Sequence, residues 1–396
     1  MHTLSILFLA LLLSSCSGLG VLKDAADGIG EYFGGKDNAE PPAELKKLEA
    51  TLTPTRLWDA SIGKGHAKAF VNLTAAVTEE RVFAADYRGL VEARDRLKGS
   101  RLWTVETGLP LSSGPVESEN RLIFGTSNGE LLALDASNGA LLWKTTLSSE
   151  ITALPKVRDD TVVVRTNDGK LAAVDARTGA SRWYHERSVP ALSIRSRGAP
   201  ALIDDTILDG FGGGKLQALS LSDGKPLWET TVAIPHGRSE VERLVEVDAD
   251  PVIQGDTAFV TGYQGGVAAV SLRDGEVLWR QDNPSSTVGM AIYRRSLFST
   301  DTQSDIWQLD ARSGADLWKQ AELHQRRLTR PALVKNYLVV GDFEGYLHVL
   351  SQDDGSLLGR IRIDDTPIEI PPLVYDDVVY VYSNGGTLAA IALESN

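Results

Sequence analysis

Short apolar runs, separated by turns that contain glycine, follow one another along most of this chain. In a representative stretch, residues 122–124 and 131–134 are apolar, and a turn at Gly129 separates them. Runs of this length between turn residues predict β-strands. Because long helical periodicity is absent from residues 51–396, we predict an all-β fold for this part of the chain.

The glycines belong to a pattern that recurs eight times. It reads Gly, five residues, Asp or Ser, three residues, Gly, three residues, Trp, and one copy consists of Gly129, Asp135, Gly139 and Trp143. The first positions of the other copies are Gly89, Gly169, Gly214, Gly265, Ser304, Gly345 and Gly386. A repeat of about 40 residues indicates stacked or radially arranged units, so most of the chain is predicted to be scaffold.

Each copy is predicted to contain two hairpin turns. The dipeptide Asn128-Gly129 suits a two-residue type I′ turn, and Gly139 can take the left-handed conformation that ends the second turn. A third strand carries Trp143, and a further strand precedes each unit, which makes a four-stranded antiparallel meander. Meanders at this period predict an eight-bladed β-propeller, in which the Trp side chains pack between neighbouring blades.

The two ends of the repeat region complement each other. The eighth copy stops at Asn396 before any strand with a Trp, whereas an isolated strand around Trp58 lies at the other end. We therefore expect the N-terminal strand to complete the last blade and close the ring, which removes an exposed edge strand. In the seventh copy Gly359 stands in place of Trp, so the contact between blades must be made differently there.

The N-terminal region predicts where the protein resides. The only cysteine, Cys16, follows an apolar run and ends a Leu-Ser-Ser-Cys sequence of the lipobox form. We predict a lipoprotein signal peptide at residues 1–15 and a lipidated Cys16; a cleaved secretory signal without lipid is the alternative. In the lipoprotein sorting pattern, Ser17 after the cysteine favours the outer membrane, so the propeller would lie in the periplasm.

The rest of the chain divides into a tether and the propeller, and its net charge limits the surfaces that it can bind. Residues 16–50 are predicted to be a tether with one helical turn at 44–48, followed by the propeller at residues 51–396. The formal net charge of −13 argues against a nucleic-acid-binding or polybasic membrane surface. The lipid is therefore the only expected contact with the membrane.

The motifs associated with catalysis or metal binding are incomplete. Residues 125–129 match G-x-S-x-G, but the hydrolase elbow needs a helix after the Ser, where a strand is expected here. The alternating acids at residues 246–250 lack the Gly and Glu that a calcium-binding EF-hand loop requires further along. The six His residues form no H-x-x-x-H pair. We predict no catalytic residue, no metal site and no cofactor.

The repeat is broken at two consecutive blades. The Trp residues of the repeat are 40 residues apart from Trp103 to Trp183, but 45 apart from Trp183 to Trp228 and 51 apart from Trp228 to Trp279. The extra residues fall at 184–200 and 231–251, and loops added to a repeat scaffold usually lie on a functional face. They bring together an apolar pair, an arginine and a group of acids, which is typical of a protein-binding patch. Drift in functionless loops is the alternative.

With these features the chain resembles the BamB family, periplasmic lipoproteins of the outer-membrane β-barrel assembly machine, over essentially its whole length. The specific matches are residues 192–195, 242–248 and 339–348. The blade motif is less specific, because quinoprotein dehydrogenases share these PQQ-like repeats.

The resemblance implies that the two insertions dock BamA, the barrel-forming insertase, through its periplasmic POTRA domains. The partner-binding residues carried over from the family are Leu192, Ile194, Arg195, Glu246 and Asp248. The family usually has Leu at position 194 and Asp at position 246. Both differences keep the chemistry, although the longer Glu246 changes the reach of the carboxylate.

The implied function is a non-catalytic adaptor that aids the assembly and insertion of β-barrel proteins into the outer membrane. Direct binding of unfolded outer-membrane proteins is a further implication. One alternative is a quinoprotein (PQQ-dependent) dehydrogenase, which would show a bound chromophore and dye reduction once the quinone and calcium are added. Another is a lipoprotein that binds peptidoglycan or a different envelope protein.

Overall fold

The computed structural model describes residues 40–66, 70–187, 197–235, 238–239 and 243–395. The chain divides into two compact units, Met1–Pro41 and Pro42–Asn396. The description below concerns the second unit. Its regular structure consists of strands, and no helix in the described part of the chain is long and apolar enough to cross a membrane.

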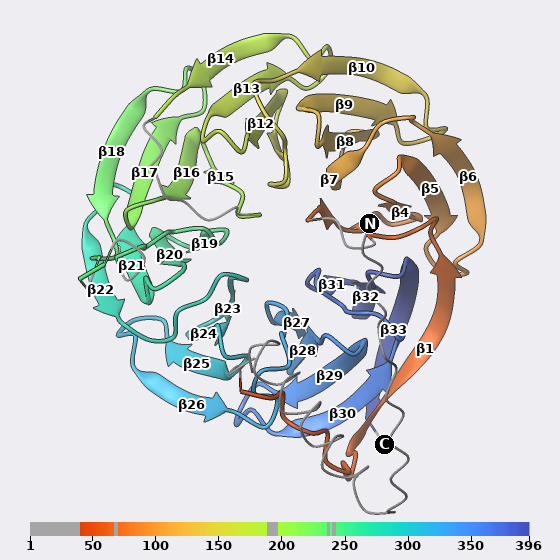
Figure 1. The fold of residues 1–396 in the computed structure, drawn as a ribbon, viewed down its shortest axis with the longest axis vertical. Helices are drawn as coiled ribbons and strands as arrows, with labels where there is room; N and C mark the ends of the chain where they lie inside the picture. The colour runs from red at the N-terminus through yellow and green to blue at the C-terminus, as the bar shows by residue number, and fades with distance from the viewer. Residues whose placement is uncertain (1–39, 67–69, 188–196, 236–237, 240–242, 396) are drawn as a thin grey trace, which may run out of the picture. The chain divides into compact units, whose positions relative to one another are not determined.

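Eight antiparallel sheets follow one another around a ring, as the sequence predicts (Figure 1). Blades 1 to 4 contain, in order, β3 (Ala76–Val77), β4 (Arg81–Ala85), β5 (Leu90–Asp95) and β6 (Arg101–Glu106); β7 (Leu111–Ser118), β8 (Arg121–Thr126), β9 (Glu130–Asp135) and β10 (Leu141–Thr146); β11 (Lys156–Arg158), β12 (Thr161–Arg165), β13 (Leu171–Asp175) and β14 (Ser181–His185); β15 (Ala201–Ile203), β16 (Thr206–Phe211), β17 (Lys215–Ser220) and β18 (Pro226–Thr231).

Blades 5 to 8 contain, in order, β19 (Val252–Gln254), β20 (Thr257–Thr261), β21 (Val267–Ser271) and β22 (Val277–Gln281); β23 (Met290–Tyr293), β24 (Ser296–Thr300), β25 (Ile306–Asp310) and β26 (Asp316–Gln320); β27 (Ala332–Val334), β28 (Tyr337–Gly341), β29 (Tyr346–Ser351) and β30 (Leu357–Arg362); β31 (Leu373–Tyr375), β32 (Val378–Tyr382), β33 (Thr387–Ser395) and the N-terminal β1 (Leu52–Ser61). Blade 2 gains a short fifth strand, β2 (Asn72–Leu73), which runs parallel to β7.

The position of a strand in its blade decides how its side chains are buried. The first strands lie nearest the axis and the fourth strands form the rim (Figure 1). The second and third strands are buried on both faces, because each blade lies between two others; β8 and β9 are examples. Rim strands such as β10 expose most of their residues. The core is therefore a series of apolar layers between blades rather than one central cluster.

The Trp residues of the repeat link neighbouring blades, which confirms the predicted packing. Each indole Nε1 donates a hydrogen bond of 2.9–3.2 Å to a backbone carbonyl in the next blade. The second Gly of the repeat lies against the same ring; a Cβ on Gly179 would be 2.6 Å from Trp143 Cε3. The repeat therefore contains Gly and Trp because each pair forms one contact between two blades.

Closure of the ring also follows the prediction. β1 pairs with β33 in antiparallel register, from Leu52 opposite Ser395 to Ser61 opposite Thr387. At Gly359, which has no Trp, an added Cβ would overlap the carbonyl oxygen of Leu52. The backbone of β1 thus takes the place that an indole occupies elsewhere.

Two local predictions are wrong. In the loop between β8 and β9, Gly129 has a φ of 79°, but Asn128 has no positive φ, so the turn is not type I′. Turns with two positive φ values occur instead between first and second strands, as at Glu119 (47°) and Asn120 (61°). Residues 44–48 have no helical turn, and they pack against the propeller in an irregular conformation.

Candidate protein-docking site

The two insertions are described in part. Leu192, Ile194 and Arg195, in the first insertion, lie outside the described residues. Glu246 and Asp248, in the second, are described, and each side chain is 5% exposed. The sequence pattern predicts acids of an exposed protein-binding patch at these positions, but both residues are buried in the isolated chain.

Residues 245–248 are inserted between blades 4 and 5. Glu246 forms isolated β-bridges with Gly212 on one side and Tyr263 on the other. The amide of Gly213 donates to the carbonyl of Val245 at 2.8 Å, and the amide of Glu246 donates to the carbonyl of Tyr263 at 3.2 Å. The backbone of this segment is thus held by the second-to-third-strand turns of two blades.

Two glycines make room for the inserted segment. An added Cβ on Gly262 would overlap the carbonyl oxygen of Glu246, and one on Gly210 would overlap the side chain of Val247. Val247 is 2% exposed and belongs to an apolar layer of blade 5. Close backbone approach of this kind needs glycine. Gly210 and Gly262 therefore belong to the site, although neither is part of the blade motif.

Burial changes the charge state of Asp248. Burial, then the neighbouring charge of Glu246, raises the pKa of Asp248 to about 7. The amide of Tyr263, which donates to Asp248 Oδ1 at 3.1 Å, opposes this shift, as does the charge of Arg165. Asp248 consequently titrates near neutral pH, where an exposed aspartate would be fully ionised.

Three further charged residues support the site and were missed from the sequence. Asp209, on β16, is fully buried and forms ion pairs with both Arg165 and Arg187. The Arg187 guanidinium also stacks on the Phe211 ring at 4.1 Å. The available signal was Asp209 itself, a carboxylate inside an otherwise apolar strand, because such a group needs a buried partner.

The described ends of the insertions meet at Asp250, which confirms that consecutive blades bring the two insertions together. Its Oδ1 accepts a 2.7 Å hydrogen bond from the amide of Ala199, and its Oδ2 pairs with Lys156 at 3.0 Å. Among the described residues no group of three or more His, Cys, Asp or Glu side chains is arranged to hold a metal ion. Asp250 therefore serves to join the insertions.

The first insertion also touches the opposite part of the ring. Arg197 pairs with Glu369 at 3.3 Å and stacks on the Phe70 ring at 4.5 Å. Glu369 lies in the connection that precedes blade 8, far from blade 4 in the order of blades. These contacts fix the chain at the point where it leaves residues 188–196.

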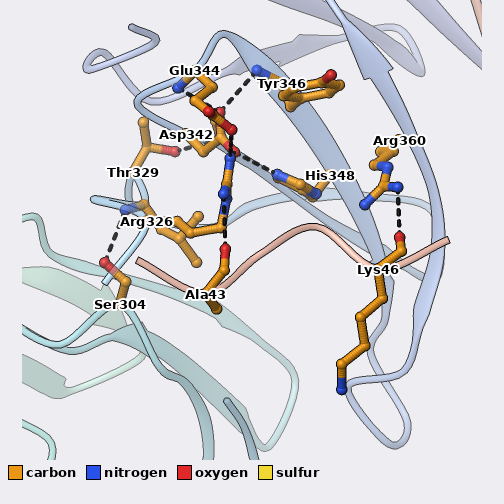
Figure 2. Close-up of polar contacts among 12 residues, drawn as sticks. Ala43, Lys46, Ser304, Arg326, Thr329, Asp342, Glu344, Tyr346, His348 and Arg360 are labelled. Atoms are coloured by element: carbon orange, nitrogen blue, oxygen red, sulfur yellow. Dashed lines mark hydrogen bonds and ion pairs between the residues drawn. The ribbon is translucent and has the colours of Figure 1, made fainter. Parts of the chain in front are cut away.

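The stretch at residues 339–348 has a structural role at blade 7 (Figure 2). Asp342 Oδ2 accepts hydrogen bonds from Arg326 Nε at 2.9 Å and Nη2 at 2.8 Å, and His348 Nε2 lies 2.9 Å away. Burial acts to raise the pKa of Asp342, but the hydrogen bonds of His348, Tyr346 and Arg326 outweigh it and lower the pKa. Asp342 therefore stays ionised and holds this corner together.

The same corner binds the segment that leads into β1. Arg326 Nη1 donates to the Ala43 carbonyl at 2.9 Å, and Arg360 Nη2 donates to the Lys46 carbonyl at 2.6 Å (Figure 2). The Leu45 side chain packs on an apolar cluster of blades 6 and 7. Part of the stretch that the sequence assigns to the tether is therefore attached to the propeller surface.

The fold and the site define an eight-bladed, Trp-linked β-propeller with segments inserted between blades 3 and 4 and between blades 4 and 5. A family model described as "Outer membrane protein assembly factor BamB" matches residues 87–320 and 304–395. A protein of that name from Alkalilimnicola ehrlichii is 47% identical over 383 residues, which cover 97% of this chain and 94% of the relative. The chain belongs to the BamB family.

Solved structures agree on the fold. The crystal structure of BamB from Moraxella catarrhalis superposes with a TM-score of 0.77 at 24% identity, covering 86% of this chain and 100% of that one. A quinohemoprotein alcohol dehydrogenase from Comamonas testosteroni gives a TM-score of 0.66 at 13% identity, covering 85% and 76%. At these identities the similarity shows the propeller architecture alone, so the dehydrogenase alternative rests on fold.

Proposed function

We propose that the protein is a non-catalytic adaptor of the outer-membrane β-barrel assembly machine and that it docks BamA through the two insertions. The observation that carries this is the rigid mounting of residues 245–248 between blades 4 and 5. A segment fixed on both sides loses little conformational entropy when a partner binds. The relatives' printed name, an outer membrane protein assembly factor, supports the same assignment.

The proposed docking surface combines anchors with a buried charged base. Leu192 and Ile194 would supply the apolar anchors, and Arg195 would pair with a carboxylate of the POTRA domains. Glu246 and Asp248 would act from beneath, because they are buried beside Arg165. We propose that these two residues keep the backbone of residues 245–248 and the charge around it in the arrangement that BamA contacts.

Substitutions at the surface test this proposal. Leu192→Ala and Arg195→Ala should each reduce co-purification of BamA about tenfold or more while leaving thermal unfolding unchanged, since truncation of an interface anchor costs more than 1 kcal/mol. The matched controls are Leu141→Ala and Arg177→Ala, which alter exposed residues of blades 2 and 3 outside the insertions. Unchanged co-purification in the first pair would remove the docking surface from this position.

The proposed location is the periplasmic face of the outer membrane, with lipid on Cys16 as the anchor and residues 1–15 removed. One acyl chain binds a membrane only marginally, so stable anchoring needs more than one. Cys16→Ser should abolish incorporation of an alkyne-labelled palmitate and move the protein from the membrane fraction to the soluble periplasmic fraction. Labelling that persists in this variant would contradict the proposal.

We also propose that unfolded outer-membrane proteins contact the propeller while it is bound to BamA. Chemical crosslinking in cells expressing a barrel protein that stalls during assembly tests this contact. A crosslink that is lost together with BamA binding supports an indirect role, and one that survives it supports direct binding.

A further inference from the structure

The turns that join first and second strands all lie on one face of the propeller, which we call the turn face. Strand direction alternates within a blade, so third-to-fourth-strand turns share this face, and the second-to-third-strand turns that hold residues 245–248 lie on the other. The two-residue turns, in blade order, are Glu79-Glu80, Glu119-Asn120, Asp159-Asp160, Asp204-Asp205, Gly255-Asp256, Arg294-Arg295, Lys335-Asn336 and Asp376-Asp377.

Charge is distributed unevenly over this face. Six of these eight turns carry at least one acid, whereas the turns of blades 6 and 7 carry Arg294-Arg295 and Lys335. The third-to-fourth-strand turn of blade 6 adds another arginine, Arg312. The first-to-second-strand turns are therefore acidic except in one basic sector, at blades 6 and 7, in a protein whose formal net charge is −13.

A groove of about 510 Å³ lies in this sector, between blades 5 and 6. Its polar walls include Arg294, Arg295 and Arg312, and its apolar lining includes Leu278 and Trp279. Leu278 is 51% exposed, although it stands next to a partly buried Trp. The groove thus offers an apolar contact beside three cations.

Two of the three guanidinium groups are available to a ligand. Arg295 pairs with Asp310, so its charge is partly neutralised within the protein. Arg294 stacks on Tyr293 at 5.0 Å, and it has no ion-pair partner in the described part of the chain. Within the same described ranges, the exposed guanidinium of Arg312 has neither a hydrogen-bond nor an ion-pair partner.

The corresponding position between blades 2 and 3 shows the contrast. There Arg177 takes the place of Arg312, but it pairs at 3.4 Å with Asp160 of the adjacent turn. That turn reads Asp159-Asp160 where blade 6 has Arg294-Arg295. The same scaffold therefore neutralises its arginine at one boundary and accumulates positive charge at another.

We propose that the groove between blades 5 and 6 binds an acidic peptide segment of a partner protein. Carboxylates of the segment would pair with Arg294 and Arg312, and an adjacent apolar side chain would cover Leu278. A flat anionic membrane fits less well, because the acidic turns of the same face would approach it at the same time. A peptide contacts the basic sector alone.

Fluorescence anisotropy on the full mature chain in non-ionic detergent tests the proposal. The probe is a fluorescein-labelled peptide of alternating Glu and Leu, and its Lys-Leu counterpart is the sequence control. The acidic probe should bind, and the affinity should fall as salt is raised from about 50 to about 300 mM, because screening weakens exposed ion pairs. The variant Arg294→Glu/Arg312→Glu should bind at least about tenfold more weakly, whereas Arg177→Glu should bind like the parent.

Circular dichroism and thermal melting confirm that the charge-reversal variants are folded. Equal binding of the Lys-Leu peptide, or binding that survives Arg294→Glu/Arg312→Glu, would overturn the proposal. A second contradicting result is that the parent binds phosphatidylglycerol vesicles but not the acidic peptide, and that Arg294→Glu/Arg312→Glu no longer binds the vesicles. The sector would then be a membrane contact. Self-association that the same variant abolishes, without peptide binding, would assign the groove to a second copy of this chain.

Discussion

Replacement of Gly179 by Ala tests the contact between Gly and Trp in the repeat. Gly179 has a φ of +71°, and its added Cβ would be 2.6 Å from Trp143 Cε3 and 2.7 Å from Thr145 Oγ1. The left-handed backbone costs about 1–2 kcal/mol for a residue with a Cβ. Overlap with a packed ring adds about 1–3 kcal/mol. We expect the free energy of unfolding to fall by about 2–5 kcal/mol in Gly179→Ala.

Gly108 supplies a matched control for the backbone cost. It also has a φ of +71°, but no heavy atom lies within 4 Å of its added Cβ. Gly108→Ala should therefore lose only about 1–2 kcal/mol. Urea denaturation, followed by circular dichroism, measures both variants. The difference of about 1–3 kcal/mol between them measures the overlap with Trp143 and Thr145 together.

A double-mutant cycle identifies the indole as the source of the overlap. Trp143→Ala alone should destabilise by about 3–5 kcal/mol, because Trp143 is a buried aromatic residue. In that background Gly179→Ala should cost less than it does in the parent, because only the contact with Thr145 Oγ1 remains. Equal costs for Gly179→Ala with and without the indole would refute the argument that the repeat pairs each Gly with a Trp.

Three further predictions concern the charged groups. Asp209→Asn removes the buried carboxylate that pairs with both Arg165 and Arg187, so the free energy of unfolding in urea should fall by about 3–5 kcal/mol. Burial raises the pKa of Asp248 to about 7, so the carboxyl loses its proton at a lower pH in the unfolded chain than in the folded one. The free energy of unfolding should therefore fall as pH rises from about 4 to about 7. Urea titrations at each pH measure this slope, and Asp248→Asn should flatten it. The Ala43 amide donates a 2.9 Å hydrogen bond to the carbonyl of His324, and the Ala43 carbonyl accepts one from Arg326. Arg326→Gln should therefore speed hydrogen exchange at the Ala43 amide about tenfold, as measured by mass spectrometry. Arg360→Gln, which removes the neighbouring contact with Lys46, is the comparison.

The repeat could be predicted from sequence because its determinants are local and periodic. Gly139 and Trp143 lie in one turn and strand, and the same spacing recurs along the chain. Ring closure could be predicted for the same reason, since the strand around Trp58 supplies what the last copy lacks. A fold encoded in this way can be predicted without knowing which distant residues each side chain contacts.

The charged base of the proposed docking site depends on contacts that periodicity does not encode. Arg165 and Asp209 are 44 residues apart and come from different blades. The spacing of these two residues in the sequence does not show that they form a buried ion pair. The attachment of Ala43 to Arg326 joins residues 283 apart, so the irregular segment gave no sign of its position.

Turn geometry marks a different limit. Asn128-Gly129 has the composition of a type I′ turn, but only the Gly takes a positive φ. The hydroxyl of Thr126 accepts a 2.9 Å hydrogen bond from the amide of Glu130, and this contact fixes a three-residue loop instead. A side chain outside the dipeptide thus decides the turn type.

Site-specific photo-crosslinking in the cell envelope tests the central claim most directly. A photo-reactive residue at position 194, in place of Ile194, should crosslink to BamA. The same residue at position 317, in place of the exposed Leu317 on the rim of blade 6, should not. A crosslink to BamA from position 317 but not from position 194 would contradict the proposed docking surface, and no crosslink to BamA from any position on the ring would contradict the adaptor function itself.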